Sequence, residues 1–196
     1  MKKNTIQRLE TKRQLFHALA GTFIAFFMYI DIFPVWLFFI LVLTGLVIYS
    51  CWEDGAQPII QWFFNNFERS EEKRGTGALW YVIGCFLTVL IFPRNAALGA
   101  LMILAWGDSV SHWVGRFYGH IPHPFNKKKN VEGILAGTIA AIAGAVFFVP
   151  NLPAVIASVV VMNLEVIPFK IGKYIVNDNF WIPLVAAAII TGVNML

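Results

Sequence analysis

The apolar residues of this chain are gathered into long blocks that short polar stretches separate. A soluble domain of this size would spread its apolar residues at the period of a helix or strand, so that each element has one apolar face. A helix that crosses a membrane needs about 20 consecutive, mostly apolar residues. The blocks that approach this length are Leu15–Ile30, Pro34–Ser50, Thr76–Phe92, Ala96–Trp113, Glu132–Val149, Pro153–Phe169 and Phe180–Leu196. The pattern therefore predicts an all-α fold, a polytopic transmembrane helical bundle of about seven spans, with residues 1–196 as a single integral membrane domain.

The charged residues support this interpretation and predict how the spans are oriented in the membrane. Only 13% of the residues are charged, whereas soluble domains carry about 25%. If the N-terminus is cytoplasmic, every Lys and Arg except Arg94 falls on the inner side, as the positive-inside rule requires. We therefore expect a multi-pass membrane location with the N-terminus and the active site facing the cytoplasm. Topology and contact with anionic membrane lipids then explain the net charge of +4, which gives no reason to expect a nucleic-acid partner.

The connection after the second block has the pattern of an amphipathic helix. Its apolar residues Ile59, Ile60, Phe63, Phe64 and Phe67 share one face at helical spacing. Such a helix is typical of the headgroup layer of a membrane. It is either a connector or one wall of a lipid entry path.

The segment Gly107–Gly119 holds the densest group of chemically useful residues. If it continues the fourth helix, Asp108, His112 and Arg116 lie four residues apart on one face, with Gly115 on the same stripe. A carboxylate at the end of a span is a functional candidate, and it suits Mg²⁺. Ser109 adds a hydroxyl group, and the glycine would let a phosphate approach the backbone.

Further acidic and basic residues are expected on the same inner face. Lys127–Lys129 precede a helix start, where the helix dipole strengthens an attraction for phosphate, and Glu132 follows in the first turn. Glu165 closes the sixth block, and Asp178–Asn179 open the seventh. The chain has no Walker A sequence, so acids with lysines indicate a nucleotide site built from a metal and lysine.

Two small motifs complete the set. Arg13 and His17 lie four residues apart at the first block, where a titratable ring needs a partner. Small residues recur every fourth position in Gly133, Gly137 and Ala141, a spacing that lets helices pack closely.

Taken in order, these motifs resemble the CTP-dependent lipid kinase family, which includes dolichol and polyprenol kinases, phytol kinase and CTP-dependent diacylglycerol kinase. That family is distantly similar to phosphatidate cytidylyltransferases. The residues that carry the resemblance are Arg13, His17, Arg74-Gly75-Thr76-Gly77, Gly107-Asp108-Ser109, Gly115-Arg116, Lys129, Glu132-Gly133, Glu165, Pro168, Asp178-Asn179 and Pro183. The chain departs from the family pattern at three positions. The family commonly has lysine where this chain has Gln14, and serine or threonine where it has Asn130 and Ile134.

The resemblance implies transfer of the γ-phosphate of CTP to the hydroxyl of a long-chain lipid alcohol, with a dolichol- or polyprenol-type prenol as the first expectation. It implies catalytic roles for Asp108, Glu132 and Asp178, with Mg²⁺ held by Asp108 and Asp178. Asp108 is either the metal ligand or the base for the hydroxyl proton. The residues expected to bind the nucleotide are Arg13, His17, Ser109, Gly115, Arg116, Lys128, Lys129, Gly133, Glu165 and Asn179.

Three other functions stay open at this point. A lipid cytidylyltransferase would use the same CTP and metal, but its signature of His-Gly-Gly and spaced aspartates is absent. A small secondary transporter would show inverted repeats and acids in mid-span. A non-catalytic membrane scaffold is the third. The oligomeric state is also open, with a homodimer as one arrangement.

Overall fold

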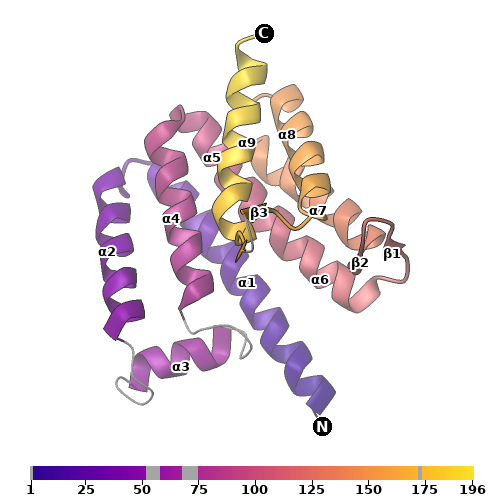
Figure 1. Ribbon diagram of the computed structural model, residues 1–196. Helices are drawn as coiled ribbons and strands as arrows, with labels where there is room; N and C mark the ends of the chain where they lie inside the picture. Colours follow the sequence, from indigo (N-terminus) through magenta and orange to yellow (C-terminus); the bar gives the residue numbers. More distant parts are fainter. Residues whose placement is uncertain (1, 52–57, 68–74, 172–173) are drawn as a thin grey trace.

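The structure, a computed structural model, describes residues 2–51, 58–67, 75–171 and 174–196, and most of these residues are helical (Figure 1). The elements in chain order are α1 (Lys2–Tyr29), α2 (Val35–Cys51), α3 (Pro58–Phe67), α4 (Thr76–Ile91), α5 (Arg94–Met102), the π-helix η1 (Ile103–Asp108), α6 (Ser109–Tyr118), β1 (Pro122–His123), β2 (Asn126–Asn130), α7 (Val131–Ala145), α8 (Asn151–Leu164), β3 (Lys170–Ile171), β4 (Tyr174–Ile175) and α9 (Asp178–Asn194).

The prediction of an all-α bundle of about seven membrane spans is wrong. Among the described residues, none of the helices combines the length with the apolar character that crossing a membrane requires. Two of the apolar blocks, Glu132–Val149 and Pro153–Phe169, overestimated helix length, because proline-containing turns end the helices early: α7 has 15 residues and α8 has 14. The longest helix, α1, has 28 residues, but its first half is polar and charged. Two short antiparallel hairpins, β1–β2 and β3–β4, also depart from an all-α fold.

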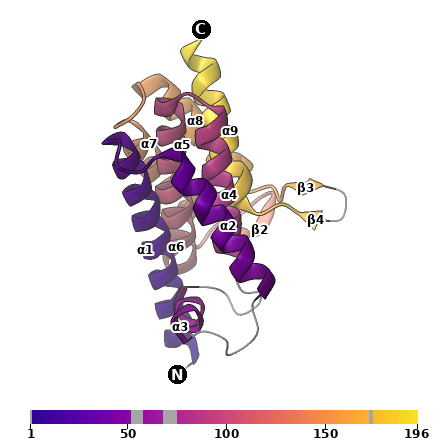
Figure 2. The same cartoon turned by 90° about the vertical axis from the view of Figure 1, so that its left-hand side faces the viewer.

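The helices form a bundle that α1 crosses obliquely. In Figure 1, α2, α4, α9 and α8 stand roughly side by side, and the N-terminal part of α1 extends below them. The short helix α3 lies across the foot of the bundle and packs against α1, and Figure 2 shows it end-on beside the N-terminal part of α1. Residues of α1, α3 and the first turns of α4 and α9 line a common cavity.

A π-helical segment interrupts one long helical run. From Arg94 to Tyr118 the chain passes from α5 through η1 into α6 without leaving the helical region. A π segment widens the helix and breaks the regular hydrogen-bond ladder, and such segments are frequent at functional sites. Asp108 is the last residue of this π-helical segment. The departure from α-helical geometry therefore includes the carboxylate that the sequence marks as a candidate metal ligand or base.

Small residues bring α7 against this interrupted helix, as their spacing predicted. A Cβ atom added at Gly137 would lie 2.6 Å from the Cβ of Ser111 and 2.7 Å from the carbonyl oxygen of Gly107. A similar close approach joins α4 to α9, because a Cβ at Gly84 would lie 2.4 Å from the carbonyl oxygen of Asn179. This contact places the first turn of α9 against the middle of α4.

Arg94, the one basic residue expected outside, holds the end of α1. Its guanidinium donates to the carbonyl oxygens of Met28 and Tyr29 at 2.6 and 2.9 Å and pairs with Asp31 at 2.7 Å. These carbonyls are among the last in α1 and lack partners within the helix. Asp31 adopts a left-handed φ of 60°, which turns the chain toward α2.

Gly137→Ala is expected to lower the free energy of unfolding by about 1–3 kcal/mol, because the added methyl group meets backbone and side-chain atoms that have little room to move. Gly192→Ala in α9 is the matched control. Nothing lies within 4 Å of a Cβ at that position, and alanine favours a helix over glycine by about 1 kcal/mol. Thermal unfolding followed by circular dichroism measures both. Equal midpoints for the two variants would contradict the packing argument.

Candidate active site

A cavity of about 820 Å³ opens between α1, α3, α4, α6 and α9, a volume typical of ligand sites. Its polar lining comes from residues that are far apart in the sequence: Arg13, Gln14, His17, Thr76, Tyr81, Asp108, His112, Asn177, Asp178 and Asn179. Its apolar lining includes Phe16, Ala20, Ile24, Phe63, Phe67, Trp80 and Val82. One cavity therefore combines ionisable groups with aromatic and aliphatic surface.

Asp108 and His112 form the centre of the polar lining. Nδ1 of His112 lies 3.0 Å from Oδ1 of Asp108 and 3.0 Å from the Asp108 carbonyl oxygen. The four-residue spacing produces this contact, since residues one turn apart in a helix are neighbours. Asp108 is only 8% exposed, so its charge needs compensation from nearby cationic or hydrogen-bonding groups.

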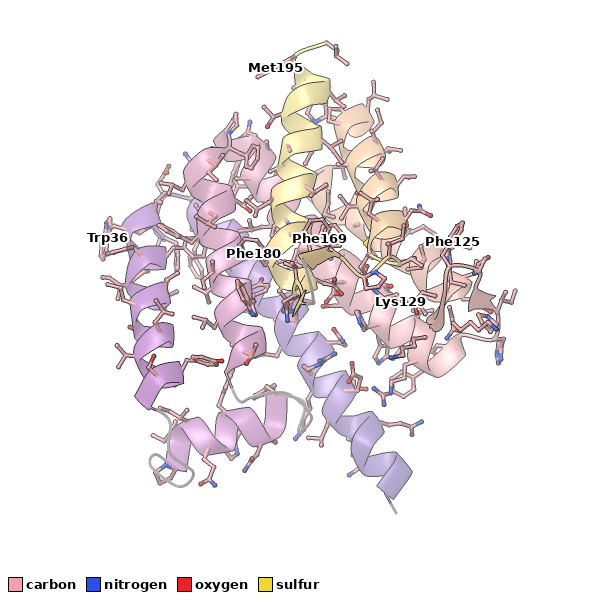
Figure 3. All side chains as sticks on the ribbon, in the orientation of Figure 1. Trp36, Phe125, Lys129, Phe169, Phe180 and Met195 are labelled. Atoms are coloured by element: carbon pink, nitrogen blue, oxygen red, sulfur yellow. The ribbon has the colours of Figure 1, made fainter. Side chains whose placement is uncertain are left out.

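A second acid continues the contact toward the β1–β2 hairpin. Oε1 of Glu165 lies 3.9 Å from Nδ1 of His112 and accepts a short hydrogen bond from Nζ of Lys129. Lys129 lies on the side of the hairpin that faces the bundle, whereas Phe125 lies at its outer edge and is 82% exposed (Figure 3). Asn126 anchors the hairpin by donating to the carbonyl oxygen of Val166 at 2.9 Å. Asp108, His112, Glu165 and Lys129 thus form one continuous chain of charged contacts.

His17 approaches Asp108 from α1. Its Nε2 atom lies 3.7 Å from Oδ2 of Asp108, and its ring packs edge-on against Tyr81 with centroids 4.7 Å apart. The ring also makes a hydrogen bond to the backbone of Leu104, in the π segment. Within the described part of the chain, the buried Nε2 has no hydrogen-bond partner.

Burial and ion pairing together set the protonation of this group. Burial disfavours the charged form of Asp108, but His112 and, more weakly, His17 and Lys129 hold its pKa below the ordinary range. Burial also works against the imidazolium of His112, yet Asp108 and Glu165 raise its pKa to about 9. At neutral pH the two residues are therefore an anion and a cation.

The other titratable groups shift mainly through burial. Burial raises the pKa of Glu165 to about 7, although Lys129 opposes the change. It also raises the pKa of Asp178 and lowers the pKa of His17. His17 is accordingly neutral under conditions in which His112 is charged.

Two helix N-termini line the cavity. The first turn of α4 contributes Thr76, Gly77 and Ala78, and that of α9 contributes Asp178 and Asn179. Gly75 precedes α4 with a φ of 82°, a conformation that favours glycine. The amide groups of a first turn and the helix dipole attract anions such as phosphate. Asn179 Nδ2 lies 3.4 Å from the Gly77 carbonyl oxygen and links the two ends.

Glu10 organises the basic residues beside the cavity. Its Oε1 accepts from Arg13 Nη2 at 2.6 Å and from Gln14 Nε2 at 2.8 Å, and its Oε2 pairs with Arg116 Nη1 at 3.1 Å. Glu10 is 6% exposed. The buried carboxylate therefore ties α1 to α6 and fixes the position of Arg13 at the cavity wall.

The structure brings together many of the residues that the sequence singled out. Arg13, His17, Asp108, Asp178 and Asn179 line the cavity. Lys129 and Glu165 adjoin it through His112. The prediction that acids and bases from distant stretches share one site agrees with these contacts.

Other predicted site residues have contacts of a structural kind. Arg116 pairs with Glu10. Glu132 accepts from the backbone amides of His120 and Ile121 at 2.9 and 3.0 Å, and its own amide and that of His120 lower its pKa. Besides Lys129 and Glu165, the predicted site residues outside the cavity lining are Ser109, Gly115, Arg116, Lys128, Glu132 and Gly133. The functional roles expected of them stay predictions.

Gly115 and Gly133 serve helix packing. A Cβ at Gly133 would lie 2.6 Å from the Ser111 carbonyl oxygen and 2.8 Å from Cα of Gly115. Ser109 is buried, and among the described residues its hydroxyl has no hydrogen-bond partner. The contacts of the two glycines therefore explain their presence without a bound phosphate.

The departures from the family pattern also have structural contacts. Gln14 binds Glu10 and lines the cavity, Asn130 donates to the Gly115 carbonyl oxygen at 2.7 Å, and Ile134 is buried in the core. Arg74 lies outside the described residues. Thus only Gln14, of the three departures, contacts the cavity.

The sequence analysis missed several cavity residues. His112 was recognised on the face of Asp108 but was given no role, and its four-residue spacing was the available signal. Glu10 lies four residues before Gln14, which was an equally visible signal. No sequence signal marked Tyr81 and Trp80 as cavity residues, because an aromatic residue within an apolar block is ordinarily a packing residue.

The donor set is compatible with Mg²⁺. Asp108 and Asp178 both offer carboxylate oxygens to the cavity, and Mg²⁺ prefers oxygen ligands, often one or two carboxylates together with substrate phosphates. Of the described residues, Asp108, His112 and Glu165 also offer ligand atoms within 4.8 Å of one another. Asp178 is not in that group, although it lines the same cavity as Asp108.

Comparison with known proteins identifies lipid kinases as relatives. The chain is 29% identical over 156 residues to CTP-dependent diacylglycerol kinase 1 of Eremothecium gossypii, covering 76% of this chain and 49% of that protein. The match to the protein of the same name from Saccharomyces cerevisiae is 26% over 158 residues, covering 76% and 54%. A probable chloroplastic phytol kinase of Triticum aestivum is 38% identical over 71 residues, covering 35% and 24%.

These relatives confirm the resemblance seen in the sequence. The chain spans about half the length of the curated diacylglycerol kinases it matches. No family model matches the chain, and no solved structure matches it.

Asp108→Asn is expected to lower the pKa of His112 from about 9, because burial then disfavours the imidazolium without the neighbouring carboxylate to oppose it. An NMR titration of the imidazole nitrogens measures this. Because the pKa of His112 is higher in the folded state than the ordinary value of 6.5, its protonation stabilises the folded state. This stabilisation is fully present below pH 6.5 and is lost as the pH rises through about 9. The unfolding midpoint should therefore fall more over that range in the wild type than in the variant. Asp31→Asn, which alters a distant exposed ion pair, should leave the His112 titration unchanged.

Proposed function

We propose, on the premise that the chain is homologous to the CTP-dependent lipid kinases, that it transfers the γ-phosphate of CTP to the hydroxyl group of a lipid alcohol within the cavity described above. The observation that carries the proposal is the mixed lining of that cavity. Carboxylates, Arg13 and two helix N-termini suit a metal-bound triphosphate, and an adjoining aromatic wall suits an apolar acceptor.

The nucleotide phosphates would contact the first turns of α4 and α9 and the guanidinium of Arg13. Phosphoryl transfer depends mainly on positioning and on neutralising the charge of the phosphates. Asp108 and Asp178 would hold Mg²⁺, which when bound neutralises the charge that the leaving group acquires. His112 keeps Asp108 ionised and oriented, since it donates to the same carboxylate.

The hydroxyl proton has a plausible acceptor in His17. The contact to the Leu104 backbone orients its ring, and Nε2 presents a lone pair beside Asp108. The acceptor oxygen forms a bond to the γ-phosphorus while the bond to the β–γ bridging oxygen breaks. The proton moves to Nε2 of His17, and CDP leaves. Asp108 is the weaker base of the two because His112 already stabilises its anion.

The acceptor is proposed as a class rather than as one molecule. The relatives are named for diacylglycerol and phytol, and the sequence analysis favoured a dolichol- or polyprenol-type prenol. All of them join one hydroxyl group to a long apolar tail. The chain would meet such an acceptor at a membrane surface.

The first test uses the full chain with Mg²⁺ and CTP labelled separately at the α and γ positions, with dolichol, phytol and dioleoylglycerol as acceptors. The proposal expects the γ label in a lipid phosphate. Incorporation of the α label would instead identify a cytidylyltransferase. Asp108→Asn should reduce the rate by at least about 100-fold, as expected for a group that stabilises transferred charge. Asp31→Asn serves as the control carboxylate and should retain the wild-type rate.

The second test replaces the proposed base. His17→Gln keeps a polar side chain but removes the basic nitrogen, and it should lower kcat by about 100-fold or more. The KM for CTP should change little, because His17 acts on the acceptor hydroxyl. A raised KM for CTP with an unchanged kcat would show that His17 binds nucleotide instead.

A further inference from the structure

Three phenylalanine rings form a cluster on one wall of the cavity. Phe16 of α1 lies 5.2 Å from Phe63 and 4.8 Å from Phe67, measured between ring centroids, and the two α3 rings lie 5.1 Å apart. All three rings line the cavity. The spacing of four residues between Phe63 and Phe67 puts both rings on the face of α3 that meets α1.

This aromatic wall begins directly beside the polar group. Phe16 precedes His17 in α1, and Ala20 and Ile24 follow at intervals of four residues along the same cavity-lining face. On α4, Tyr81, whose ring packs against His17, and Trp80, whose ring packs edge-on against Phe180, both line the cavity. An apolar surface thus leads away from the position at which the reacting hydroxyl would lie.

The wall has apolar surface that the described protein does not cover. Phe16 is 41% exposed and Trp80 is 36% exposed, although both line a cavity. Ala20 contributes only a methyl group between Phe16 and Ile24, which leaves room beside the rings. An apolar ligand would remove this surface from water.

The position of α3 is set by contacts with α1. Besides the ring cluster, Nζ of Lys12 donates to Oδ1 of Asn66 at 3.0 Å. Ile59, one turn before Phe63 and on the same helix, is 81% exposed and lies outside the cavity lining. The part of α3 that faces the cavity is therefore its second half.

We propose that Phe16, Phe63, Phe67 and Trp80 form the subsite for the apolar tail of the acceptor lipid, and that α3 thereby selects acceptors by the length of that tail. The identity of the occupant rests on the proposed lipid kinase function. The continuity of the wall with His17 and Asp108 carries the assignment, because prenols, phytol and diacylglycerols all have their free hydroxyl at one end of the molecule and their apolar part at the other. A stacked cytosine base is the competing occupant, since bases also stack on aromatic side chains.

A kinetic experiment separates these two occupants. The full chain is assayed in detergent micelles with dioleoylglycerol or dioctanoylglycerol as acceptor, and the KM is measured separately for acceptor and for CTP. Phe67→Ala should raise the KM for dioleoylglycerol by roughly tenfold, the size expected for lost apolar contacts in a pocket. It should raise the KM for dioctanoylglycerol less, and it should leave the KM for CTP unchanged.

A second variant fills the space instead of enlarging it. Ala20→Phe should impair dioleoylglycerol more strongly than dioctanoylglycerol, because the new ring would occupy the path of the longer tail. Ile59→Ala is the matched control on α3 and should behave as the wild type with both acceptors. Thermal unfolding identifies any variant that has lost its fold, and the remaining variant then decides the outcome. A raised KM for CTP in Phe67→Ala or Ala20→Phe would overturn the proposal in favour of a base-stacking site.

A binding experiment without turnover separates this inference from the kinase proposal. A diacylglycerol with a diazirine near the end of one acyl chain is photolysed with the full chain, and the labelled peptides are mapped by mass spectrometry. Labelling of α1 and of residues 58–67 that excess dioleoylglycerol suppresses would support the tail subsite even if CTP were never consumed, in which case only the kinase proposal fails. Kinase activity with labelling confined to other helices would overturn the tail subsite and leave the kinase proposal standing.

Discussion

Asp108 is a buried carboxylate, and the arrangement of its neighbours follows from the need to compensate its charge. An isolated ion inside a protein costs several kcal/mol even after relaxation. His112 supplies the nearest positive charge, and Glu165 and Lys129 extend the pairing to the β1–β2 hairpin. Because each member compensates the next, elements from three parts of the sequence are held together at one place. The same pairing keeps Asp108 anionic, which is the state that a metal ligand requires.

The π segment and the small residues of α7 make this arrangement possible. The π segment ends at Asp108 and includes Leu104, whose backbone orients His17. Gly137 lets α7 approach within contact of Gly107 and Ser111, which brings the hairpin before α7 toward the bundle. The π segment and the packing of α7 thus both help to position the side chains around Asp108.

The sequence predicted contacts within an element better than contacts between elements. One-turn spacing was sufficient for Asp108 and His112, and of the other predicted acids and lysines, Asp178, Glu165 and Lys129 lie at or beside the cavity. Arg116 shares that spacing, but its side chain reaches Glu10, 106 residues away, a partner that only the packing of α1 on α6 provides. Glu132 had the position of a site residue at a helix start, yet it satisfies the backbone of a turn that hydropathy could not reveal. The apolar blocks marked helices correctly, but two of them overestimated helix length, because apolar residues continue into the turns that end α7 and α8.

The link between Glu10 and Arg13 has a consequence for ligand exchange. Arg13 faces the cavity with an anion already bound to it, so an incoming phosphate must compete with Glu10 rather than meet an unpaired cation. The free energy gained when phosphate binds Arg13 is then only the difference between the Arg13–phosphate and the Arg13–Glu10 interactions. In the proposed kinase reaction, Glu10 would pair with the guanidinium again as the phosphorylated product departs, so Arg13 would not be left as an unpaired cation. An internal competitor of this kind weakens binding of every anion by a similar amount and so favours turnover over retention.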